Sequence, residues 1–209
     1  NAAAALDTTA AGDLWDNTLM TTTGTYAVRF SPLSATSGDN LLSYTLPTLV
    51  DGLGITGSYV AANTTGSGSS AFGATYTGVE GLTVSYGHAS SDNVLNVSGD
   101  QTIMKASYAY GSFTVGISEN DYDHTTSSND QEVSSISLAY TVSDQISVTY
   151  GEDTIERSSQ GTDIEVSGVS ASYTSGGMTA TVASVTAENT DHTAGTDREV
   201  WKIGLSFAF

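Results

Sequence analysis

The sequence contains no cysteine, so it can form neither a disulfide framework nor a thiolate metal site. Bases are almost as scarce: five lysines and arginines stand against 23 aspartates and glutamates, which gives a formal net charge of −18. Such an acidic chain would repel nucleic-acid phosphates, and a cationic partner or solute suits it better. No stretch approaches eighteen apolar residues, which excludes a transmembrane helix.

Charged residues as a whole make up only 13% of the chain, and there are only two prolines, whereas glycine, serine and threonine are abundant. Low charge combined with few helix-forming residues favours strands. The length of 209 residues suits a single domain. There is neither an initiator methionine nor a signal-peptide pattern at the start, so we expect the chain to be mature, trimmed or incomplete.

The sequence does contain a repeat, in which an aromatic residue stands between two small residues. It occurs six times, at spacings of 32, 32, 32, 33 and 34 residues. The six aromatics are Tyr44, Tyr76, Tyr108, Tyr140, Tyr173 and Phe207. Each lies at the end of a run in which apolar residues alternate with small or polar ones, and this period of two predicts a strand.

A tight turn with glycine or aspartate follows each of the first five aromatics and leads into a second alternating run, so each repeat predicts one β-hairpin. Longer polar connections join the hairpins, at about 63–69, 91–99, 120–131, 154–163 and 188–198. Counting the runs gives eleven strands that begin near Leu41. Residues 25–30 are a candidate for a twelfth.

The two faces of the predicted strands differ. One face is apolar, while the other carries small and hydroxyl-bearing residues such as Thr83, Ser85 and Gly87. The acids lie mostly in or beside the long connections, so that only Lys105 and Lys202 are charged in the middle of the strands. An uncharged band of strands, with tyrosines near the strand ends, predicts an all-β fold: an antiparallel up-and-down transmembrane β-barrel with a wet lumen.

The chain ends with alternating apolar residues from Trp201 to a terminal Phe209. This resembles the last strand of bacterial outer-membrane proteins, whose terminal aromatic is part of the signal read by the barrel-assembly machinery. Residues 39–47 and 51–59 resemble the hairpin after the constriction loop in sixteen-stranded general porins of Gram-negative bacteria. The resemblance implies a homotrimer that contacts lipid and lipopolysaccharide in the outer membrane and passes small hydrophilic solutes and ions by passive diffusion, without a cofactor.

In general porins eleven strands follow the constriction loop, which agrees with the strand count. A single-chain bacterial barrel closes with an even number of strands, so either a twelfth strand exists or the first strands of a longer parent chain are absent, and we favour the second. The resemblance then implies that residues 1–38 are an infolded constriction-loop segment. Residues 39–209 would supply the transmembrane strands, with short periplasmic turns and long acidic extracellular loops.

The resemblance also implies charged groups at the pore constriction, where loop acids face bases of the wall. The matching acids are Asp7, Asp13 and Asp16, and the candidate bases are Arg29, Lys105 and Lys202. Strand alternation by itself predicts that Lys105 and Lys202 point inward, because a lipid-facing lysine at mid-depth costs about 2–4 kcal/mol. Alternatively, the two lysines line a wide lumen away from its narrowest point. Because acids dominate, we expect a preference for cations.

A second candidate site is a cluster of acids formed by Asp121, Asp123, Asp130 and Glu132. Ca²⁺ prefers several hard oxygen ligands, so these residues are candidates to bind it, although such clusters are more often solvated loop faces or bind divalent ions that bridge lipopolysaccharide.

Two other functions remain as alternatives to a pore. His88 and Ser90 share a strand face, as an outer-membrane phospholipase would need, but no residue that orients the histidine can be named, so we do not expect an enzyme. The runner-up is an autotransporter-type translocator or a structural barrel, with the alanine-rich start as a helix inside the lumen.

Overall fold

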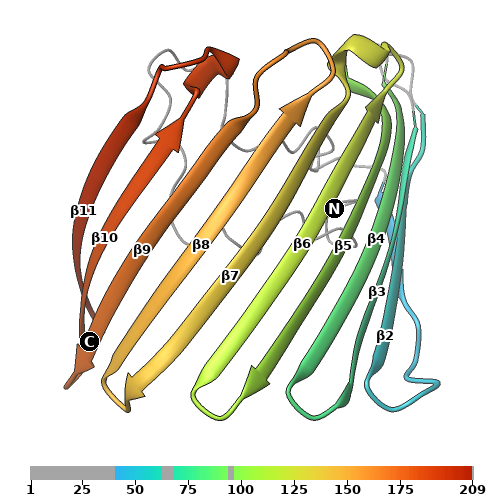
Figure 1. Cartoon of the computed structure of the whole chain (residues 1–209). Helices are drawn as coiled ribbons and strands as arrows, with labels where there is room; N and C mark the ends of the chain where they lie inside the picture. Colours follow the sequence, from blue (N-terminus) through green and yellow to red (C-terminus); the bar gives the residue numbers. More distant parts are fainter. Residues whose placement is uncertain (1–40, 63–67, 94–96, 209) are drawn as a thin grey trace.

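The computed structural model describes residues 41–62, 68–93 and 97–208. In these residues, eleven strands form one antiparallel sheet in which each strand pairs with its neighbours in sequence (Figure 1). The strands are β1 (Leu41–Thr45), β2 (Leu53–Val60), β3 (Ser69–Val79), β4 (Leu82–Asn93), β5 (Val97–Tyr110), β6 (Phe113–His124), β7 (Gln131–Ser143), β8 (Ile146–Arg157), β9 (Ile164–Ser175), β10 (Met178–Glu188) and β11 (Arg198–Phe207). None of the helices in the described part of the chain could cross a membrane.

The hairpins lie where the repeat predicts them, and the count of eleven strands from Leu41 is confirmed. The turn between β3 and β4 shows why glycine is needed there. Gly81 has φ +75°, and a Cβ at this position would lie 2.3 Å from the carbonyl oxygen of Ala109. The Ala109 N–H in turn donates to the Gly81 carbonyl at 2.8 Å, which ties this turn to β5. The candidate twelfth strand at 25–30 lies outside the described residues.

Three of the long connections are shorter than the sequence predicted, the one at 91–99 because β4 continues to Asn93 and β5 begins at Val97. β6 continues to His124 and β7 begins at Gln131, with the short helix η3 (Ser127–Asn129) between them. β8 likewise continues to Arg157. The predicted connections at 120–131 and 154–163 were therefore wrong at their starts, where many acids lie on strands instead of loops. The connection between β10 and β11 agrees with the prediction and contains η4 (Thr190–His192).

The register places residues of one kind on each face of the sheet. One face, which we call the outer face, carries Val115, Leu138, Tyr150 and Val169. These four residues lie opposite one another on consecutive strands, and all are more than 40% exposed. The inner face carries, in the next row, Ser107, Gly116, Ser137, Gly151 and Gly168. Figure 1 shows the sheet bent into a curved wall. The buried residues of β4 to β10 all lie on the inner face, as expected for a concave side.

The character of both faces changes along the strands toward the long connections. On the outer face of β6, Phe113, Val115 and Ile117 are followed by Glu119, Asp121 and Asp123. At the same end of the sheet, the inner face carries a buried apolar cluster of Val133, Ile155, Ile164, Val166, Val185 and Ala187. The apolar band of the outer face therefore ends midway along the strands, and the strands continue beyond it with a charged outer face and an apolar inner face.

Candidate functional site

The inner face near the short turns is lined by small residues with hydroxyl groups. Several of these hydroxyls hydrogen-bond across neighbouring strands. Ser147 and Ser172 lie 2.7 Å apart, Thr75 and Ser85 3.1 Å, and Thr174 and Thr179 3.0 Å. Such a surface leaves space next to the wall and offers hydrogen bonds to water or to a polar solute.

Charges are divided between the two faces by sign. The four basic residues in the described part of the chain, Lys105, Arg157, Arg198 and Lys202, all lie on the inner face. Asp153 is the exception among the acids: the other strand acids whose side chains are described lie on the outer face. They are Asp100, Glu119, Asp121, Asp123, Glu132, Glu152, Glu156, Glu165, Glu188 and Glu199.

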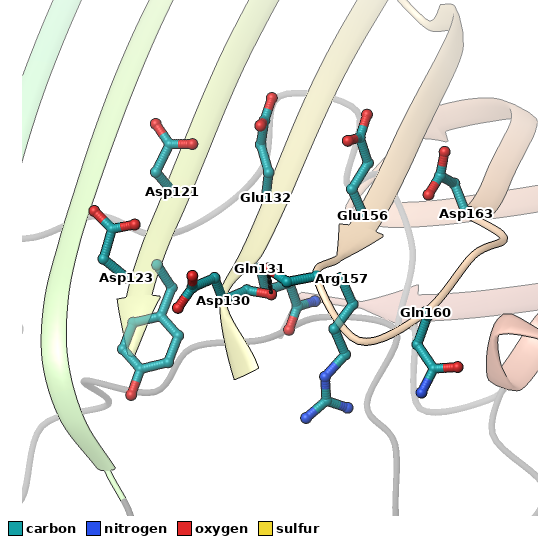
Figure 2. Close-up of a pocket in the computed structure, with 11 residues that line it drawn as sticks. Asp121, Asp123, Asp130, Gln131, Glu132, Glu156, Arg157, Gln160 and Asp163 are labelled. Carbon is teal, nitrogen blue, oxygen red and sulfur yellow. Dashed lines mark hydrogen bonds between the residues drawn. The ribbon is translucent and has the colours of Figure 1, made fainter. Parts of the chain in front are cut away.

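This division is visible across β6, β7 and β8. Figure 2 shows Asp121, Glu132 and Glu156 next to one another on these three strands, whereas the guanidinium group of Arg157 points to the opposite side of the sheet. The register explains the picture, because Glu132 lies opposite both Asp121 and Glu156, while Arg157 lies opposite Gln131. Adjacent residues of one strand point to opposite faces.

A recess of about 300 Å³ lies in the inner wall between β2 and β5. Gly54, Gly73 and Gly87 leave the space, because none of them has a side chain. Its lining also includes Thr56, Thr75, Ser85, Ile103 and Lys105. One ammonium group beside several hydroxyls is a combination that can hold a small polar or anionic solute.

The predicted lysines of the lumen wall both lie on the inner face. Lys105 lies opposite Ser118 on β6, is half-buried and interacts with other parts of the protein. Lys202 lies opposite Ala183 and is exposed. The structure does not bring them together, since they belong to β5 and β11. Asp7, Asp13, Asp16 and Arg29, predicted at the constriction, lie outside the described residues, as does Phe209, the predicted assembly signal.

The predicted cluster of four acids is only partly brought together. Asp121 and Glu132 are joined by Glu119, and one carboxylate oxygen of each lies within 4.8 Å of the others on the outer face. Asp130 is engaged elsewhere, because its carboxylate accepts the backbone N–H of His124 at 2.9 Å, and Asp123 lies opposite Asp100. Three carboxylates are fewer than the six to eight oxygens that Ca²⁺ takes, so water would have to supply the rest.

His88, the base of the phospholipase alternative, lies on the outer face. Its Nδ1 hydrogen-bonds the Thr102 hydroxyl at 3.1 Å. Thr102 lies opposite His88 on β5, and Ser90 lies opposite Asp100. A hydroxyl partner does not stabilise a positively charged histidine as a carboxylate would, so among the described residues this arrangement shows no third member of a hydrolase triad.

Sequence reasoning missed Arg157, Arg198 and Glu119 as candidate site residues. The alternation that predicted the strands would have found Arg157 and Glu119 if it had been extended. Ser147, Thr149 and Gly151 continue to Asp153 and Arg157 on the inner face, and Phe113, Val115 and Ile117 continue to Glu119 on the outer face. A dense run of acids was interpreted as the start of a loop.

A family model described as Gram-negative porin matches residues 1–193. The anion-selective porin from Comamonas acidovorans is similar in structure, with 13% identity and a TM-score of 0.68 over 81% of this chain and 59% of the porin. A porin structure refined at 1.8 Å has 19% identity and a TM-score of 0.66, over 88% and 66% of the two chains.

A mutant of the Rh. blastica porin has 18% identity and a TM-score of 0.58, over 82% of this chain and 56% of that one. No curated protein sequence matches the chain. At these identities the likenesses show the fold, a porin β-barrel, and the chain spans between 56% and 66% of the lengths of the three porin structures.

Proposed function

This chain belongs to the Gram-negative porin family, and on that premise we propose that its strands form the wall of a water-filled pore through which small hydrophilic solutes diffuse down their gradients. The family and the fold place it in the bacterial outer membrane. They also indicate a channel rather than an enzyme. Diffusion requires no covalent step, and we propose no cofactor for it.

One observation supports the proposal most strongly, the contrast between the two faces of the sheet near the short turns. Val115 and Leu138 are exposed on the outer face, where lipid chains would cover them. The residues behind them are small, such as Gly116 and Ser137. A soluble sandwich would bury its apolar face and expose its polar one, whereas a wall between lipid and a wet lumen requires this arrangement.

The pore needs a narrowest part, which would set the size of the solutes that pass. We propose that residues 1–38 fold into the lumen and narrow it, while 39–209 form the wall. Asp7, Asp13, Asp16 and Arg29 would then set charges across the constriction. Trimers are typical of the family, and we propose a homotrimer here too. We also propose that the assembly machinery recognises Phe209, that the barrel contacts lipopolysaccharide, and that Glu119, Asp121 and Glu132 bind Ca²⁺.

The charge selectivity of the proposed pore depends on more than the net charge of the chain. The net charge of −18 predicts a preference for cations. A similar structure is named an anion-selective porin, although the identity of 13% carries no residue-level inference. A solute in the lumen interacts with the charges of the inner face. The described charges of that face are mainly positive, whereas the chain as a whole is negative.

The proposed pore is tested by planar-bilayer recording of the purified full-length protein. Discrete, long-lived conductance steps in KCl are expected, together with swelling of proteoliposomes in small sugars. A protein that inserts into the bilayer and passes no current would contradict the pore. The autotransporter alternative would gain if residues 1–11 formed a helix that crosses a closed barrel.

A further inference from the structure

The charges that face the inside of this wall are mainly positive, although the chain as a whole is strongly acidic. Lys105, Arg157, Arg198 and Lys202 lie on the inner face. Among the strand acids with described side chains, Asp153 alone lies there. It is 4% exposed, so a solute in the lumen cannot contact its carboxylate directly.

The acids of the outer face contribute little to the field inside. Their side chains point away from the inner face, because alternate residues of a strand point to opposite faces. They are also concentrated near the long connections, beyond the apolar band, as Glu119 and Asp121 on β6 illustrate. At physiological ionic strength the Debye length is about 8 Å, so water and salt around these carboxylates screen them from the lumen.

Lys202 is the most exposed of the four bases on the inner face. It is exposed, lies opposite Ala183 and stands between Ile203 and Trp201, which point to the outer face. Lys105, Arg157 and Arg198 each interact with other parts of the protein. Lys202 has no hydrogen bond or ion pair with the described residues.

We propose that the inner wall of this chain favours small anionic solutes, such as carboxylates and phosphate esters, over cations of the same size, and that it outweighs the proposed constriction acids Asp7, Asp13 and Asp16. This inference rests on the proposed pore and adds the charge class of the solute. The recess beside Lys105 provides a second point of contact, where Thr75 and Ser85 offer hydroxyls next to the ammonium group. Charge-assisted hydrogen bonds of this kind are stronger than neutral ones.

The first test is the zero-current potential of the full-length protein in a planar bilayer under a tenfold KCl gradient. We expect the sign that corresponds to chloride permeating faster than potassium. The opposite sign would overturn the inference while leaving the pore intact. Absence of channels would instead contradict the proposed function, so the two failures are distinguishable.

The second test compares two substitutions on β11. Lys202→Gln is expected to lower the ratio of chloride to potassium permeability by about two-fold at low salt, the effect of one charge several ångströms from the ion path. Glu199→Gln, on the outer face of the same strand, is expected to leave the ratio unchanged. Equal effects of both substitutions, or none from Lys202→Gln, would overturn the inference.

A third variant guards against misfolding. Lys202→Arg keeps the charge, so the ratio should stay at that of the unmodified protein. If Lys202→Arg lowered the ratio as much as Lys202→Gln does, the effect would come from altered packing instead of charge, and the inference would be wrong. The single-channel conductance of each variant shows that it has folded and inserted.

Discussion

Single residues at the turns determine where this chain reverses direction. Gly81 and Gly111 both have positive φ, at +75° and +59°. They differ in their surroundings, because a Cβ on Gly81 would meet the Ala109 carbonyl oxygen at 2.3 Å, whereas a Cβ on Gly111 meets nothing within 4 Å. The two positions therefore separate the conformational cost of a side chain from its steric cost.

We predict that Gly81→Ala destabilises the folded protein more than Gly111→Ala. Both substitutions place an L-residue in the left-handed region, at about 1–2 kcal/mol. Only Gly81→Ala must also displace the Ala109 carbonyl, which adds roughly 1–3 kcal/mol. Urea unfolding of the protein refolded into lipid vesicles measures the difference. Equal midpoints for the two variants would show that the close approach at Gly81 does not hold in the membrane.

At the scale of the strand, the main feature is the change of character along each strand. Near the short turns, the outer face is apolar and the inner face carries small, polar residues. Near the long connections, β6 to β8 carry Asp121, Glu132 and Glu156 on the outer face, directly opposite one another. Like charges in opposing positions weaken strand pairing, so this end of the sheet is held by its backbone ladder and by the inner apolar cluster.

We predict that Glu132→Gln stabilises the sheet when divalent cations are absent. It removes the central member of three facing carboxylates, which relieves about 0.2–1 kcal/mol for each like-charged pair. With Ca²⁺ the gain should shrink or reverse, because Glu119, Asp121 and Glu132 are then needed as ligands. Unfolding in EDTA and in Ca²⁺ measures both states.

Glu152→Gln is the matched control, since it lies on the same face opposite Ile136 and Ser167, without a facing acid. Its stability should depend little on Ca²⁺. The same Ca²⁺ dependence in both variants would argue against a discrete cation site.

The same feature explains how far the sequence could predict the strands. The alternation from Phe113 to Ile117 was recognised because lipid demands an apolar outer face there. Beyond Ile117 the outer residues become acids, and the run from 120 resembles a loop in composition. The strand continues because alternate residues still face inward and pack, as Tyr122 does at 3% exposure. Composition reports the surroundings of a residue as well as its backbone conformation.

At the scale of the whole molecule, net charge and lumen charge have to be separated. A chain of −18 predicted a cation-preferring pore. The fold sorts the charges by face, with Lys105 and Lys202 inward and nearly all described strand acids outward. Alternation could have predicted this sorting once the strand ends were known. It could not have predicted the Lys105 recess, which depends on the glycines of three neighbouring strands.

In the proposed pore, Ser137 faces water while Leu138, the next residue, faces lipid. A single thiol can be introduced at each position, and this chain adds no cysteine of its own to the background labelling. In the full-length protein in bilayers, a charged, membrane-impermeant thiol reagent should modify Ser137→Cys and reduce its conductance, and it should leave Leu138→Cys unmodified. Modification of Leu138→Cys with protection of Ser137→Cys would contradict the account.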